Sequence, residues 1–134
     1  MTFVKAAGLG PITFSNGATT KAPVFAVAGE TDWIDGGRFV APEAGCYQFS
    51  GQTICDGRIH QLLLLDEVGG ELAMLAYSGQ SDPASNNTVL NGTDILDLPA
   101  GAKVWLGAKH NSGSSKTINE PRSAGRLRLI VQKM

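Results

Sequence analysis

The sequence carries little charge, and its charges are not clustered. Its 134 residues include 11 Lys and Arg and 12 Asp and Glu, with a formal net charge of −1. Nucleic-acid binding relies on clustered positive charge, so we expect no nucleic-acid partner. No run of 18 apolar residues occurs, so no membrane-spanning helix is expected. The start, Met1 to Lys5, lacks the basic region and apolar run of a signal peptide, although processing would hide one.

Cysteine and histidine are also scarce, with two of each. Cys46 and Cys55 lie nine positions apart on what the pattern predicts to be one strand. At about 3.3 Å per residue their separation is roughly 30 Å. A disulfide cannot bridge that distance, so we expect both thiols to be reduced. Two Cys and two His dispersed along the chain make a poor zinc set.

Motifs of the common catalytic sites are missing. There is no Gly-x-Ser-x-Gly elbow, and Gly8-Leu9-Gly10 lacks the Lys-Ser/Thr ending of a phosphate loop. His60 lies within a predicted strand and His110 opens a polar loop, so neither has a recognisable catalytic context. Asp32 and Asp35 could bind calcium, but turn-stabilising aspartates are the simpler interpretation. We therefore expect no enzyme activity, no cofactor and no metal site.

A helical pattern is absent as well, and extended segments take its place. No convincing apolar period of 3.6 extends over a dozen residues. About ten short segments alternate with turn signals such as Asn16-Gly17 and Gly69-Gly70. This pattern predicts an all-β protein, an antiparallel sandwich or jelly roll. The length suits one domain, spanning residues 1–134.

Two stretches dominate the predicted sandwich. Residues 37–50 are GRFVAPEAGCYQFS, in which Pro42 ends one strand and Gly45 completes a tight turn before the next. Residues 96–106 are LDLPAGAKVWL, which repeats the arrangement around a Pro-Ala-Gly turn. Alternation within these and the last strand predicts the core residues Phe39, Tyr47, Phe49, Leu96, Leu98, Val104, Leu106, Leu127 and Leu129.

Together the two stretches resemble the globular head of the C1q and tumour-necrosis-factor superfamily. The family pattern Gly-x-Phe-x-Ala-Pro-x-x-Gly-x-Tyr-x-Phe matches from Gly37 to Phe49. Its pattern Leu-x-Leu-x-x-Gly-Asp-x-Val-Trp-Leu matches from Leu96 to Leu106, with Ala102 in place of the aspartate. A Ser-Gly element before the final strand appears with one residue inserted, at 123–125.

The resemblance covers residues 33–131 and implies a C1q/TNF-like antiparallel jelly roll that assembles as a compact homotrimer. The strand at 62–65 has apolar residues on both faces, and Trp105 and Ile130 have the opposite parity to their apolar neighbours. The outer face of an antiparallel sheet is normally exposed to water, so something should cover these residues. Either loops or other subunits could cover them. The resemblance favours subunits, and the predicted trimer interface is Leu62, Leu64, Trp105 and Ile130.

Five arginines leave two interpretations open. They could face a carboxylate-bearing partner, or they could simply lie on solvated strand faces. The residues concerned are Arg38, Arg58, Arg122, Arg126 and Arg128.

Residues 1–29 match the family poorly, but they are too apolar for a solvated tail. We expect edge strands or a docking arm there, with Phe3, Val4, Ile12 and Phe14 as candidate docking residues. The overall hypothesis is a non-enzymatic homotrimeric structural or binding protein. Because no collagen-like stalk or export signal is visible, we favour a bacteriophage component on the virion surface. It would be a capsid decoration (cement) protein on the major capsid protein, or a fibre knob. The alternative is an extracellular C1q-like head that recognises a ligand or a carbohydrate.

Overall fold

The computed structural model describes residues 2–8, 10–15, 17–55, 61–77, 88–109, 116–118 and 127–134. These residues form antiparallel strands and one short 3-10 turn, η1 (Thr31–Trp33). The strands are β1 (Phe3–Gly8), β2 (Ile12–Phe14), β3 (Thr19–Ala22), β4 (Val24–Gly29), β5 (Ile34–Asp35), β6 (Arg38–Val40), β7 (Gly45–Cys55), β8 (Gln61–Leu65), β9 (Glu71–Tyr77), β10 (Thr88–Leu98), β11 (Lys103–Lys109), β12 (Lys116–Ile118) and β13 (Leu127–Lys133).

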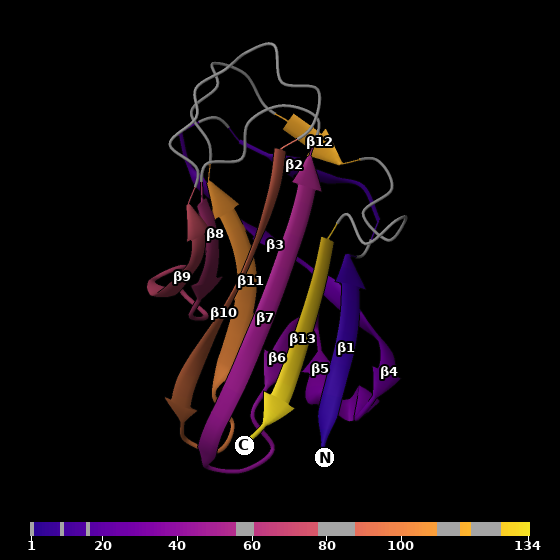
Figure 1. The fold of residues 1–134 in the computed structure, drawn as a ribbon, viewed down its shortest axis with the longest axis vertical. Helices are drawn as coiled ribbons and strands as arrows, with labels where there is room; N and C mark the ends of the chain where they lie inside the picture. The colour runs from indigo at the N-terminus through magenta and orange to yellow at the C-terminus, as the bar shows by residue number, and fades with distance from the viewer. Residues whose placement is uncertain are drawn as a thin grey trace.

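The first sheet has the order β10-β7-β13-β1-β4 and forms the front layer in Figure 1. Its long central strand, β7, pairs with β10 on one side and β13 on the other. Aromatic and polar residues alternate along β7, and successive side chains of a strand point to opposite faces. Tyr47 and Phe49 are therefore fully buried, whereas Gln48 and Ser50 lie on the outer face of the sheet.

The second sheet lies behind the first and has the order β5-β6-β11-β8-β9, with β3 also paired to β11. The register of β11 with β8 places Leu106 opposite Leu64 and Trp105 opposite Leu65. A separate ladder joins β2 to β12 at the upper end of the sandwich in Figure 1. Both chain termini lie at the opposite end (Figure 1). This is the all-β antiparallel sandwich that the sequence predicted.

The core lies between the two sheets. Of the nine predicted core residues, Leu96 is half-buried against the core and the other eight are buried. Trp33, Phe39, Tyr47 and Phe49 meet edge to face, with ring centroids 5.2 to 6.0 Å apart. Each such pair contributes about 0.5–1.5 kcal/mol beyond simple burial. The Tyr47 hydroxyl donates a hydrogen bond of 2.7 Å to the Glu43 carbonyl, so its one polar atom is satisfied.

A cross-strand pair of glycines lets the two sheets close at one side. Gly92 of β10 is opposite Gly51 of β7, and both face β9. A Cβ on Gly92 would collide with the backbone carbonyl of Leu75, and one on Gly51 would lie 2.7 Å from Leu75 Cδ1. The approach of β9 to β10 therefore depends on the missing side chain of Gly92.

The prediction of an N-terminal docking arm is wrong for three of its four residues. Strand β1 is not an edge strand, since it lies between β13 and β4. Val4 and Phe14 are fully buried and Ile12 is 5% exposed, all within the core. Phe3 alone of the four is partly exposed, at 39%. Among the described strands, the edge strands expected within residues 1–29 are β4, at the end of the first sheet, β3, which pairs only with β11, and β2, which pairs only with β12.

Candidate interaction surfaces

The four residues predicted to form a trimer interface do not lie together. Leu62 and Leu64 are fully buried between the sheets, so their assignment to an interface is wrong. A run of four leucines has no alternation, and only the pairing of Leu64 with Leu106 fixes which ones face inward. The outward pair, Leu63 and Leu65, is also buried within a single chain. The leucines of β8 therefore offer almost no surface to another copy.

The other two predicted interface residues lie on opposite sides of the sandwich. Trp105 alternates with the core residues Val104 and Leu106, and so lies on the outer face of the second sheet. Ile130 alternates with the core residues Leu129 and Val131, and so lies on the outer face of the first sheet. The two residues therefore do not form one contiguous patch on a single chain, and their place at a trimer interface stays a prediction.

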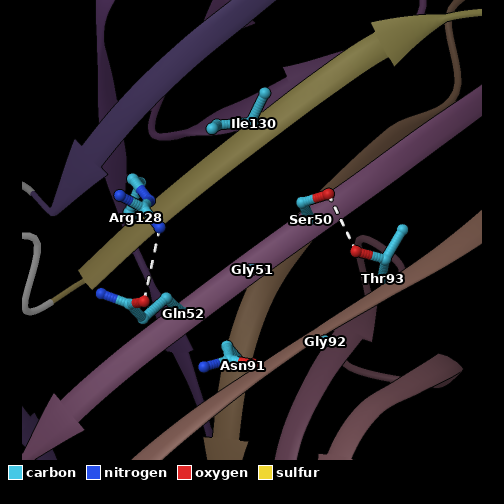
Figure 2. A pocket seen from close by; sticks show the side chains of 8 residues that line it. All are labelled: Ser50, Gly51, Gln52, Asn91, Gly92, Thr93, Arg128 and Ile130. Carbon is cyan, nitrogen blue, oxygen red and sulfur yellow. Dashed lines mark hydrogen bonds between the residues drawn. The ribbon is translucent and has the colours of Figure 1, made fainter.

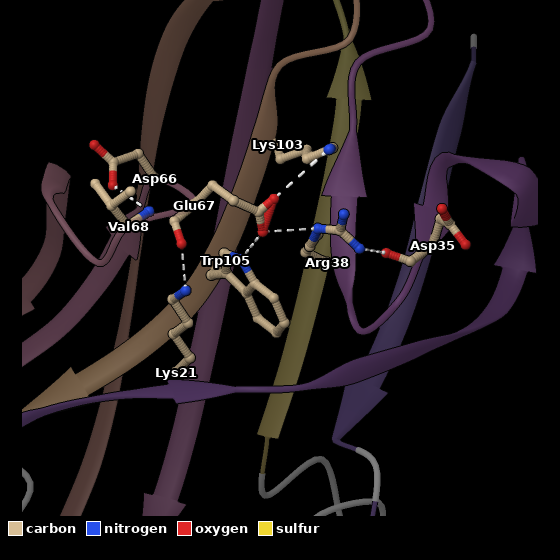
Figure 3. A network of polar contacts seen from close by, with 8 residues as sticks. All are labelled: Lys21, Asp35, Arg38, Asp66, Glu67, Val68, Lys103 and Trp105. Atoms are coloured by element: carbon tan, nitrogen blue, oxygen red, sulfur yellow. Dashed lines mark hydrogen bonds and ion pairs between the residues drawn. The ribbon is translucent and has the colours of Figure 1, made fainter.

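On the second sheet, Trp105 is the centre of a polar cluster that we call the Trp105 clasp (Figure 3). The indole Nε1 donates to Glu67 Oε1 at 2.9 Å, and Arg38 Nε pairs with the same oxygen at 3.1 Å. Lys103 Nζ lies 3.7 Å from Glu67 Oε2. The ammonium of Lys21 lies 4.9 Å from the indole centroid, within the range of a cation–π interaction.

The clasp ties the turn between β8 and β9 to β3, β6 and β11. Lys21 Nζ donates to the Glu67 carbonyl, and Arg38 Nη1 donates to the Asp35 carbonyl. The turn itself is closed by Asp66 Oδ1, which accepts from the backbone of Val68 and Gly70. The positive and negative groups of this face therefore largely satisfy one another.

The clasp also sets the charge state of Glu67. The hydrogen bond from Trp105 lowers the pKa of the Glu67 carboxyl below its ordinary value of 4.5. Desolvation, the second-largest influence, acts in the opposite direction, and the cations Arg38, Lys103 and Lys21 each lower the pKa further. The carboxylate is thus held ionised at neutral pH, which is the state that all of its partners require.

The outer face of the first sheet is different. Its central positions are mostly uncharged: Gln48, Ser50 and Gln52 from β7, Asn91, Thr93 and Ile95 from β10, and Arg128, Ile130 and Gln132 from β13. Ile130 is half-buried and Ile95 is 50% exposed. Alternation in the sequence predicts that such residues point outward, but not which strands bring them together.

A shallow groove, which we call the β7 groove, crosses this face (Figure 2). It encloses about 260 Å³ and is lined by Ser50, Gly51, Gln52, Asn91, Gly92, Thr93, Arg128 and Ile130. Ser50 Oγ and Thr93 Oγ1 lie 3.0 Å apart in a hydrogen bond. Arg128 Nη2 donates to Gln52 Oε1 at 3.3 Å. Nothing in the sequence singled out this groove except the polar parity of β7.

Several residues that the sequence raised as candidates lie outside the described residues: His60, His110, Arg58, Arg122 and Arg126. Cys46 is an exposed free thiol at the start of β7. Asp32 lies in η1 and Asp35 in β5. Within the described part of the chain, no three His, Cys, Asp or Glu side chains are grouped to hold a metal ion. No helix in that part is long and apolar enough to cross a membrane.

Comparison with protein-family models and with curated proteins finds no match. Among solved structures, murine APRIL matches with a TM-score of 0.69 at 10% identity, covering 99% of this chain and 98% of that one. The Eiger TNF structure from S. frugiperda gives 0.66 at 13% identity, covering 99% and 92%. The globular domain of the zebrafish complement 1qA protein gives 0.63 at 13% identity, covering 100% and 98%. The chain therefore has the fold of a C1q/TNF-like head, a jelly roll, as its motifs predicted.

Proposed function

We propose that the protein is a non-enzymatic homotrimeric head that assembles through the outer face of its first sheet. The observation that supports this most directly is the contrast in charge between the two outer faces. Most outward side chains around Ile95 and Ile130 on β7, β10 and β13 are uncharged, with Arg128, Asp97 and Lys5 as the charged exceptions, and interface centres are typically depleted in charge. The likeness to C1q and TNF-type heads supports a trimeric binding module.

A cyclic trimer needs two different patches on each copy, because each subunit contacts its two neighbours through different surfaces. We place one patch on β10 around Ile95 and the other on β13 around Ile130. Both are apolar residues with exposed surface on the same sheet, separated by β7. Packing the β10 side of one copy against the β13 side of the next would cover both isoleucines.

The direct test is the mass of the protein in solution. Light scattering at micromolar concentration is expected to give three times the 14.0 kDa of one chain. A mass equal to one chain would overturn the proposed assembly.

Within this class we propose a virion component on the virion surface, bound to the major capsid protein as a decoration protein or forming a fibre knob. The exposed free thiol of Cys46 is compatible with folding in a reducing compartment. Binding of the purified protein to particles that lack it tests this role. Failure to bind such particles would count against it.

The alternative is an extracellular recognition head. The solved structures of similar fold include a TNF from an insect and the head of a complement protein, which supports this second reading. Binding to a glycan or cell surface, in place of particles, would favour it.

A further inference from the structure

The β7 groove contains an arginine, Arg128, that forms few hydrogen bonds with the described residues. A guanidinium has five N–H donors in a planar fork. Within the described part of the chain, Arg128 makes one hydrogen bond, to Gln52 Oε1, and its length of 3.3 Å is at the long end of the normal range. Figure 2 shows the guanidinium at one end of the groove, beside Gln52.

Arg38 on the opposite side of the sandwich has a carboxylate partner, which Arg128 lacks among the described residues. Arg38 pairs with the Glu67 carboxylate and donates to the Asp35 carbonyl. Its side chain is 16% exposed. No Asp or Glu is among the described residues that line the β7 groove, so Arg128 has no such partner there.

The acidic residues of β10 are too far along the strand to compensate. Asn91 lines the groove beside Gln52, whereas Asp94 and Asp97 follow it by three and six residues. These spacings correspond to roughly 10 and 20 Å along a strand. The positive charge of Arg128 is therefore not neutralised by the sheet that carries it.

The other polar groups of the groove suit the same kind of ligand. The Ser50 and Thr93 hydroxyls can each donate a hydrogen bond, and the amide of Asn91 carries two donors. Ser50 and Thr93 now bond each other, and either can redirect its proton to a ligand oxygen. The volume of about 260 Å³ leaves ample room for such a ligand. Charge and donors thus point to a small anion with several oxygen atoms.

We propose that the β7 groove binds a small oxyanion of the phosphate or carboxylate type, with Arg128 as its charged anchor. Arginine suits this role because its planar fork matches two oxygens of one ligand. The inference goes beyond the proposed assembly and does not require it. In a monomer the groove is open to solvent, and in the proposed trimer the anion would neutralise Arg128 inside the interface.

Titration calorimetry on the full chain with inorganic phosphate, and separately with acetate, tests the proposal. Ionic strength is kept constant by exchange against sodium chloride. We expect saturable binding by the wild type and an affinity at least about tenfold lower for Arg128→Gln, because a hydrogen-bonded charge pair is lost. Binding of phosphate alone would assign a tetrahedral anion, whereas binding of both would assign a general carboxylate and phosphate site.

Lys5→Gln is the matched control. Lys5 is an exposed cation of β1 on the same face, opposite Ile130, and it does not line the groove. Its substitution should leave the affinity unchanged. Absence of saturable binding by the wild type, or equal affinity of the wild type and Arg128→Gln, would overturn the proposal.

A second measurement keeps the proposal testable if Arg128→Gln folds poorly. In amide NMR spectra of the wild type, phosphate should shift the resonances of Gln52, Asn91 and Arg128. Shifts confined to other strands would overturn the site. Mass measurements with and without phosphate separate this proposal from the assembly, since a monomer that binds phosphate contradicts only the trimer, and a trimer that does not bind contradicts only the anion site.

Discussion

The polar groups on the two outer faces of this sandwich differ in charge and in how they are paired. On the second sheet, Glu67 accepts from Trp105 and pairs with Arg38 and Lys103, so the charges cancel within one chain. On the first sheet, Ser50, Gln52 and Asn91 are uncharged, Ile130 is half-buried, and Arg128 has only one long hydrogen bond among the described residues.

This difference indicates which face can be covered by another molecule. Removing a cluster of charges from water is costly even when the charges are paired, so the Trp105 clasp is suited to remain solvated. Uncharged amides and hydroxyls cost less to desolvate and can form hydrogen bonds to a partner. A face whose central strands carry mostly uncharged side chains, with Ile95 exposed and Ile130 half-buried, is therefore the better surface for assembly.

The largest expected effect comes from removing the strand that supports the first face. Deleting residues 1–10 takes out β1, which lies between β13 and β4 and contributes the buried side chains of Val4 and Ala6. Most domains are stable by only about 5–15 kcal/mol, so loss of an internal strand should leave the chain largely unfolded. Circular dichroism and thermal melting provide the measurement.

Phe3→Ser is the control for the deletion, since it alters a partly exposed residue of the same strand and should stay folded. A truncated chain that melts like the wild type would show that β1 is dispensable. It would also restore the docking arm that the sequence predicted.

The next largest effect concerns the close packing of the two sheets, which keeps the two outer faces on opposite sides of the molecule. Gly92→Ala places a methyl group against the Leu75 carbonyl, which is backbone and cannot move without shifting β9. Overpacking of this kind costs about 1–3 kcal/mol and occasionally more. Asn91→Ala, one residue away on the outer face, should change the stability by less than about 0.5 kcal/mol. Equal denaturation midpoints for the two variants would contradict the close approach of β9 to β10.

A charge on each face should separate their roles in assembly. Ile130→Glu introduces a carboxylate into the proposed interface, where its desolvation costs several kcal/mol even beside Lys5 and Arg128, so the trimer should dissociate to folded monomers. Val68→Glu changes a residue that is 92% exposed in the turn of the second sheet, and it should remain trimeric. Sedimentation velocity distinguishes the two. Dissociation by Val68→Glu with no effect of Ile130→Glu would move the interface to the second sheet.

The sequence predictions that agree with the structure rest on local alternation of apolar and polar residues. Residues 37–50 and 96–106 alternate clearly, and the core residues chosen from them are buried or packed against the core. Residues 62–65 do not alternate, so their inward face was fixed only by the register with β11. The same lack of information explains why Leu62 and Leu64 were assigned to an interface.

Contacts between distant parts of the chain could not be predicted in this way. Glu67 and Trp105 are 38 residues apart, and their hydrogen bond depends on where the β8–β9 turn meets β11. The groove likewise depends on β7 pairing with both β10 and β13. β1 is an internal strand because it pairs with the last strand, β13, so strands from the two ends of the chain lie side by side. None of these pairings is encoded in a local pattern.

The smallest expected effect is a pH dependence that belongs to the second face alone. The folded protein holds the pKa of Glu67 below its ordinary value of 4.5, chiefly through the Trp105 hydrogen bond. Between the folded and unfolded pKa values the unfolded chain binds more protons, so stability rises with pH in that window. The contribution of the Glu67 carboxylate is therefore present above about pH 4.5 and is lost as the pH falls through the folded pKa.

Urea denaturation of the wild type and Glu67→Gln should show a difference in the free energy of unfolding that is constant near neutral pH and shrinks on acidification below about pH 4.5. Glu71→Gln removes a carboxylate from β9 of the same hairpin and should not reproduce this loss. A Glu67→Gln profile parallel to that of the wild type down to about pH 3 would show that the clasp does not depend on the charge of Glu67.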